Sequence, residues 1–268
     1  MNFKTFFGFK KMPFDNDILL DDLIKLPGMT MAKERVDYIL ACGGVAVLTG
    51  ELGSGKSTSL RWSLSQYHPN QYKIINLVGH GGTSIDFYRQ LCWGIGIDIF
   101  GISRSLLIKN FKTAARDIVQ AKKQKILLAI DEAQLLRSDV FAELHTITQF
   151  DHDSKNFVSV VLSGQSGVLD KLSLRGSAPL ASRVIAKVHL SGINRDQMQE
   201  YLNHHTKICG NKVSLFADNA TTAIQQGSAG ILRKANSLAR GGLIAAAAEK
   251  QEMVSAEHIR IAASELVT

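Results

Sequence analysis

Residues 50–58, "GELGSGKST", have the composition and spacing of a loop that binds phosphate groups. Glycine at these positions lets backbone N–H groups converge on phosphate oxygens, where a side chain would block them. A lysine at the end of such a loop reaches the β- and γ-phosphates, and the hydroxyl that follows ligates Mg²⁺. The segment therefore predicts a site for ATP and Mg²⁺, with Lys56 on the phosphates and Ser57 on the metal. Its members are Gly50, Glu51, Leu52, Gly53, Ser54, Gly55, Lys56, Ser57 and Thr58.

Two acidic residues follow an apolar run in "KILLAIDEAQLL", residues 125–136. A strand that ends at Asp131 places a carboxylate at the carboxyl edge of the sheet, where ligands of open α/β sheets bind. Asp131 would hold Mg²⁺ through water, and Glu132 would orient and polarise the attacking water. The alternative is that both acids only cap the next helix. Their occurrence together with the phosphate loop favours the catalytic interpretation.

A polar side chain is also expected at the tip of the fourth apolar run, which ends in "SGQSG". Gln165, or Ser163 as a second choice, would lie at the same sheet edge and could sense the γ-phosphate. The alternative is a turn residue with no such role.

Three arginines are candidates for contacts with the nucleotide. Arg175 and Arg183 flank "GSAPLAS", and neither is expected at a strand tip that faces its own loop. Either could instead complete the site of a neighbouring subunit as an arginine finger. Arg233, in "GILRKAN", could reach the nucleotide from the helical region. An ordinary surface position is the alternative for all three.

The elements that position these residues can be predicted from the apolar pattern. Five short runs rich in β-branched residues predict strands at 45–50, 73–78, 125–130, 158–164 and 186–192. Amphipathic stretches lie between them, and alternation of this kind indicates an α/β fold with a five-stranded parallel sheet covered on both faces. Residues 194–208, 214–227, 229–250 and 255–267 predict helices only. We expect an N-terminal segment at 1–40, a nucleotide-binding domain at 41–192 and a helical lid at 193–268.

Composition narrows the class of protein. The apolar runs are far shorter than the ~18 residues that cross a bilayer, and no signal peptide is visible, so we expect a soluble, cytoplasmic protein without a membrane contact. Three cysteines without a CxxC pair indicate reduced thiols. His205 and Cys209 could share a helix face, but no second ligand pair supports a metal site. The net charge of +7 fits a nucleic acid partner, with a merely basic surface as the alternative.

The order of the motifs resembles that of AAA+ ATPases, and within them the ExeA/GspA-type branch. "TGELGSGKST" resembles the Walker A motif, "LLAIDEAQLL" the Walker B motif, and "GILRKANSLARGGLIAA" the sensor-2 helix. The resemblance extends nearly from end to end and implies an AAA+ P-loop NTPase fold. It also implies that Arg183 is the arginine finger and Arg233 the sensor-2 arginine. Leu232 stands where the secretion members commonly have proline.

Short members of this branch are similar to transposition ATPases of the Mu B and TnsC type. That similarity implies a homo-oligomer, either a ring or a filament, that assembles with ATP on double-stranded DNA and recruits or stimulates a DDE transposase. The segment 83–105 is longer than a simple crossover needs, and the resemblance implies phosphate contacts from Arg89, Arg104 and Lys109. A secretion-type ATPase and an initiator-like or helicase-loader-like ATPase remain as alternatives.

Overall fold

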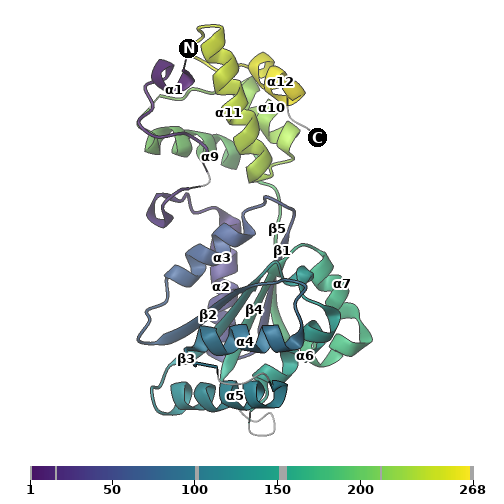
Figure 1. The fold of residues 1–268 in the computed structure, drawn as a ribbon. Coiled ribbons are helices and arrows are strands. Elements are labelled where there is room, and N and C mark those ends of the chain that lie inside the picture. Colours follow the sequence, from purple (N-terminus) through teal and green to yellow (C-terminus); the bar gives the residue numbers. More distant parts are fainter. Residues whose placement is uncertain (1, 16, 100–102, 151–155, 212, 266–268) are drawn as a thin grey trace. The chain divides into compact units, whose positions relative to one another are not determined.

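The computed structural model describes residues 2–15, 17–99, 103–150, 156–211 and 213–265. Its contacts divide the chain into two units (Figure 1). The sheet unit comprises residues 27–50 and 56–190, and the helical unit comprises residues 1–26, 51–55 and 191–268. Of the N-terminal segment expected at 1–40, residues 1–26 group with the helical unit and residues 27–40 with the sheet unit.

The sheet unit contains a five-stranded parallel sheet, as predicted. Its strands are β1 (Val45–Gly50), β2 (Tyr72–Val78), β3 (Lys125–Asp131), β4 (Val158–Gly164) and β5 (Val184–Leu190). All neighbouring strands pair in parallel, in the order β2-β3-β4-β1-β5. Since β4 lies between β1 and β3, the segments that follow these three strands emerge side by side at one edge.

Helices cover both faces of this sheet (Figure 1). They are α2 (Pro27–Cys42), α3 (Lys56–Ser65), α4 (Ser84–Ile95), α5 (Arg104–Gln120), α6 (Ser138–Thr148), α7 (Gly167–Ser173) and α8 (Ala178–Ala181). Side chains of β1 alternate between two apolar clusters, with Val45 and Val47 facing α4 to α6 and Ala46 and Leu48 facing α2 and α3. This alternation explains why the central strands β1, β3 and β4 are almost wholly apolar, because both of their faces are buried. The edge strands β2 and β5 carry exposed polar residues such as Asn76 and Lys187.

Strand β5 begins two residues earlier than the apolar pattern predicts. Val184 pairs with Val45 beside an irregularity in the β1–β5 register, and the N–H of Val45 donates to the carbonyl of Arg183 (2.9 Å). The strand ends at Leu190, because Ser191 and the residues after it group with the helical unit.

The helical unit has an apolar core of its own. Its helices are α1 (Phe3–Phe6), α9 (Arg195–Ile208), α10 (Asp218–Ser228), α11 (Leu232–Ala248) and α12 (Ala256–Glu265). Asn194 begins α9 with a capping box, in which its side chain and that of Gln197 each accept from the other's backbone N–H. Three phenylalanines of the N-terminal segment, Phe7, Phe9 and Phe14, are buried in the same core as α9 to α12.

Candidate functional site

The phosphate loop joins β1 to α3, as the sequence predicts. Gly53 and Gly55 have φ angles of 85° and 94°, in the left-handed region that side-chain-bearing residues rarely adopt. Lys56 is the first residue of α3, and its Nζ donates to the carbonyl of Gly50 (3.0 Å). Among the described residues, the buried Oγ of Ser54 has no hydrogen-bond partner. These conformations, with a free hydroxyl and a lysine beside them, fit the oxygens of a triphosphate.

The acid pair lies at the end of β3, two strands from β1. Asp131 Oδ1 accepts from the hydroxyl of Ser163 on β4 (2.8 Å) and from the N–H of Glu132 (2.9 Å). Glu132 has φ 49° and ψ 37°, a left-handed conformation for a residue that is not glycine. Such a conformation costs about 1–3 kcal/mol and marks functional turns more often than ordinary ones. The sheet therefore brings Asp131, Glu132 and Ser163 together at the edge where the phosphate loop begins.

Gln165 is exposed just past β4, and its backbone N–H donates to the side chain of Gln134 (3.1 Å). Gln134 also donates from Nε2 to Glu132 Oε2 (2.5 Å). Sequence reasoning assigned no role to Gln134. Its position two residues past Glu132, on the tight turn Ala133–Leu135, is the signal that could have identified it.

Arg183 lies at the opposite end of the sheet from these residues. It immediately precedes β5, whose first residue pairs with Val45 and whose last residue pairs with Gly50. At roughly 3.3 Å per residue, the seven residues of β5 separate Arg183 from the edge of the phosphate loop by about 20 Å. Arg175 is exposed at the start of a short 3₁₀ turn, Arg175–Ser177. The structure thus does not bring Arg183 to the phosphate loop of its own sheet.

Arg233 belongs to the first turn of α11, in the helical unit. The backbone N–H of Arg233 donates to the carbonyl of Gly53 (3.1 Å), and residues 51–55 group with this unit. A Cβ at Gly53 would lie 2.5 Å from the Cβ of Arg233, so the close approach requires glycine at this position. The side chain of Arg233 is exposed.

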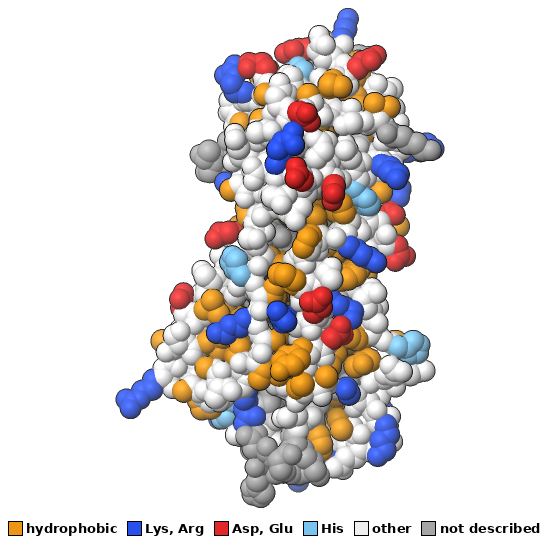
Figure 2. Space-filling view, turned by 180° about the vertical axis from the view of Figure 1, so that it is seen from behind, with side chains coloured by type: hydrophobic (Ala, Val, Ile, Leu, Met, Phe, Trp, Pro, Cys, Tyr) orange, Lys and Arg blue, Asp and Glu red, His pale blue; other side chains and the backbone are white. Residues whose placement is uncertain are grey.

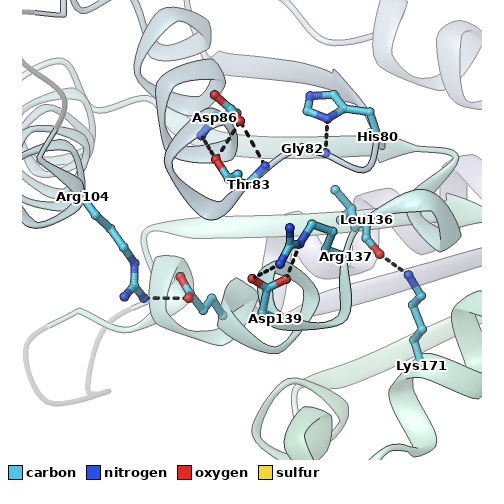
Figure 3. A network of polar contacts seen from close by, with 10 residues as sticks. His80, Gly82, Thr83, Asp86, Arg104, Leu136, Arg137, Asp139 and Lys171 are labelled. Atoms are coloured by element: carbon cyan, nitrogen blue, oxygen red, sulfur yellow. Dashed lines mark hydrogen bonds and ion pairs between the residues drawn. The ribbon is translucent and has the colours of Figure 1, made fainter.

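The three candidates for DNA contacts lie on α4 and α5. Arg89 pairs with Asp86 (3.4 Å), and hydrogen bonds from Thr83 hold the pKa of Asp86 below its usual range. Arg104 pairs with Glu143 of α6 (2.7 Å), as Figure 3 shows. Lys109 is exposed on α5. Two of the three side chains therefore already have carboxylate partners.

A basic stripe formed by Lys109, Lys112 and Arg116 follows one side of α5. These residues recur at intervals of three and four, so they lie on neighbouring turns of the helix. Burial lowers the pKa of Lys112, and the positive charge of Arg116 lowers it further. The charges of Lys112 and Arg116 are thus close enough to repel one another.

Basic and acidic side chains are interspersed over the face of the molecule that Figure 2 shows. On that face the excess of positive charge is not gathered into one patch. Within the described ranges, no group of three or more His, Cys, Asp or Glu side chains could hold a metal ion. The ring of His205 stacks on that of Phe14 (centroids 5.1 Å apart) and lies tilted against that of Tyr201 (4.4 Å). Among the helices that the structure describes, none combines the length and apolar character needed to cross a membrane.

Comparison with known proteins identifies families and structures that are similar to this chain. Residues 42–172 match a family described as an AAA domain. General secretion pathway protein A of Aeromonas hydrophila is 27% identical over 274 residues, which cover 98% of this chain and 48% of that protein. The chain therefore spans about half the length of this relative.

Solved structures of similar fold include Cdc6p from Pyrobaculum aerophilum, with a TM-score of 0.68 and 17% identity, over 95% of this chain and 70% of that one. The ORC1 protein of Aeropyrum pernix, solved in complex with DNA, has a TM-score of 0.67 and 18% identity, over 94% and 68%. The RuvB branch migration motor of Thermotoga maritima has a TM-score of 0.53 and 17% identity, over 97% and 72%. The chain therefore has the AAA+ P-loop NTPase fold, and its match to the AAA domain family spans both the phosphate loop and the acid pair.

Proposed function

We propose that this protein binds and hydrolyses ATP with Mg²⁺, and that the nucleotide controls its assembly as a homo-oligomer on double-stranded DNA. ATP binding and hydrolysis are supported by the sheet edge where Asp131 ends β3, Ser163 lies near the end of β4 and Glu132 follows β3. Strand β4 lies beside β1, which leads into the phosphate loop. The reaction proposed at this edge is transfer of the γ-phosphoryl group of ATP to water.

Each residue of the edge has a distinct role in this proposal. The phosphate loop binds the triphosphate, and Lys56 offsets the charge of the β- and γ-phosphates. Ser57 and Asp131 would hold Mg²⁺, which neutralises charge that develops on the phosphate oxygens. Glu132 orients and polarises the attacking water. Gln165 senses the γ-phosphate, and Arg233 contacts the nucleotide from α11.

Homo-oligomeric assembly is supported by the position of Arg183. The separation of about 20 Å along β5 prevents Arg183 from acting on its own phosphate loop. An arginine finger supplied by a neighbouring subunit requires this separation, because the residue must project away from its own site. Arg183 would thus complete the site of the next subunit and link hydrolysis to assembly.

DNA binding is supported by the basic stripe on α5 and by the net charge of +7. Contacts from these side chains would read the charge and path of the DNA backbone without sequence preference. Lys109 is the best placed of the three candidates, since Arg89 and Arg104 would have to exchange a carboxylate for a phosphate. The recruitment of a DDE transposase is part of the proposal and rests on the resemblance to transposition ATPases.

A secretion-type ATPase is the second candidate, favoured by the similarity to General secretion pathway protein A over nearly the whole chain. The similarity in fold to Cdc6p and ORC1 fits an initiator-like ATPase equally well. A measurement of DNA binding distinguishes the secretion-type candidate from the main proposal.

The test is to measure binding of a labelled duplex of random sequence by fluorescence anisotropy, with and without a non-hydrolysable ATP analogue, over a range of salt concentrations. We expect binding that depends on the analogue. Lys109→Ala should weaken binding to every duplex alike and should reduce the slope of log K against log salt by ~0.9.

Lys122→Ala is the matched control, because Lys122 is exposed just beyond the end of α5. It removes the same charge and should leave the slope unchanged. A protein that hydrolyses ATP but does not bind duplex DNA at low salt would refute the DNA proposal and favour the secretion-type candidate. If the protein does bind duplex DNA, electron microscopy of the protein with duplex and ATP analogue would distinguish a ring from a filament.

A further inference from the structure

Gln134 links the carboxylate of Glu132 to the tip of β4. The amide nitrogen of Gln134 donates to Glu132 Oε2 (2.5 Å), and its amide oxygen accepts from the backbone N–H of Gln165 (3.1 Å). One side chain thus joins the acid assigned to the attacking water and the residue assigned to the γ-phosphate.

The orientation of this amide is determined by both partners together. If the amide were turned over, its oxygen would face the oxygen of Glu132 and its NH₂ group would face the N–H of Gln165. Both contacts would then be repulsive, because a carboxylate only accepts hydrogen bonds and a backbone N–H only donates them. Gln134 therefore acts as a directional connector, since a movement at either end changes the hydrogen bond at the other.

The surrounding backbone leaves room for this connector through two glycines. A Cβ at Gly164, the last residue of β4, would overlap the amide oxygen of Gln134. A Cβ at Gly79, just past β2, would overlap the carbonyl of Glu132. The left-handed conformation of Glu132 also begins the tight turn that carries Gln134 back onto the carboxylate. Three separate features of the backbone thus support one side-chain position.

We propose that Gln134 is a positioning residue for ATP hydrolysis, which holds the carboxylate of Glu132 in the direction of the attacking water and couples that direction to the tip of β4. This inference rests on the proposed ATPase function. Gln134 does not touch ATP or water in this mechanism, and its effect passes entirely through Glu132 and Gln165. A carboxylate that is fixed at one oxygen leaves the other oxygen directed for the water.

The first test is steady-state phosphate release from Mg-ATP by Gln134→Ala. The kcat should fall by roughly 10- to 100-fold, because a displacement of about 1 Å in a catalytic group can cost on the order of 100-fold. The KM for ATP and the affinity for a fluorescent ATP analogue should stay within about twofold, since the phosphate loop is unchanged. A purely structural role would instead lower the fraction of folded protein, so that the amount of analogue bound at saturation would fall in proportion to the apparent kcat.

Gln124→Ala is the matched control. Gln124 immediately precedes β3, at the end opposite to Glu132, and its side chain also makes a hydrogen bond, to the carbonyl of Pro69 (2.7 Å). The substitution removes the same side chain and one hydrogen bond from the same strand region. It should leave kcat unchanged.

Gln134→Glu provides the second test. An ionised glutamate would repel Glu132 and could not donate to it, whereas a protonated glutamate has the shape and hydrogen-bonding pattern of glutamine. Charged groups beside this turn include Asp131, which accepts from the N–H of Glu132, Lys171, whose Nζ donates to the carbonyl of Leu136, and Arg137, which follows the turn. The kcat of this variant, relative to that of the parent, should therefore rise as the pH falls from 8 to 6.

The outcomes separate this inference from the function on which it rests. A parent that hydrolyses no ATP, alone or with DNA, would remove the proposed function and this inference with it. A parent that hydrolyses ATP, with a Gln134→Ala variant of equal kcat, would refute only the positioning role. A Gln134→Glu variant whose activity relative to the parent is independent of pH would refute it as well, even if Gln134→Ala failed to fold.

Discussion

The burial of His205 makes a quantitative prediction about the stability of the helical unit. His205 lies in the core between the rings of Phe14 and Tyr201 and is only 5% exposed. Burial lowers the pKa of His205 from 6.5 to about 4, and the charge of the neighbouring His204 contributes in the same direction. The folded state therefore keeps this imidazole neutral at pH values where the unfolded chain binds a proton.

The sign and size of the effect follow from this difference. Because the unfolded state binds more protons between pH 6.5 and 4, the free energy of unfolding must fall as the pH falls through that window. The pKa of His205 is about 4 in the folded state and 6.5 in the unfolded state, and each pH unit between them is worth about 1.36 kcal/mol. The free energy of unfolding should therefore fall by roughly 3 kcal/mol between pH 7 and pH 4.

The measurement is urea unfolding of the parent and of His205→Phe at a series of pH values from 7.5 to 4. Phenylalanine keeps an aromatic ring between Phe14 and Tyr201 but binds no proton, so the variant should lose about 3 kcal/mol less than the parent over this range. His68→Phe, at an exposed position of the sheet unit, is the control and should follow the parent. Equal pH dependence in parent and His205→Phe would refute the assignment of the effect to this histidine.

The remaining predictions concern the nucleotide site. Lys56→Ala should abolish binding of a fluorescent ATP analogue, because the phosphates lose their cationic partner. Glu132→Gln should still bind ATP, but its rate of hydrolysis should fall by at least about 100-fold. A normal rate of hydrolysis by the Glu132 variant would refute the catalytic role of Glu132. Arg183→Ala should bind ATP normally and hydrolyse it on the order of 1000-fold more slowly. Mixtures of Arg183→Ala with Lys56→Ala subunits should show an ATPase activity that differs from the sum of the activities of the two variants alone. A specific activity of the parent that is independent of protein concentration would contradict action between subunits.

The residue pattern alone predicts the fold class and the chemistry of the phosphate loop. The loop is a contiguous segment whose glycines and lysine act through local backbone geometry, so its spacing is visible without a structure. The central strands are predictable because both faces of the sheet are buried there and their residues are almost wholly apolar. The start of α9 is predictable because Asn194, a residue type that caps helices, precedes Asp196 in the first turn.

Contacts between distant segments could not be derived from the sequence. The position of β4 between β1 and β3 brings Ser163 to Asp131, and strand order depends on which helices cover which face. Gln134 contacts a backbone group 31 residues away, which no local pattern encodes. Arg104 was predicted as a DNA contact from the resemblance to transposition ATPases, and only the folded structure shows its ion pair with Glu143 of α6. Local spacing thus identified the residues that we propose bind phosphate, whereas long-range packing decided which side chains lie beside Asp131 and Glu132.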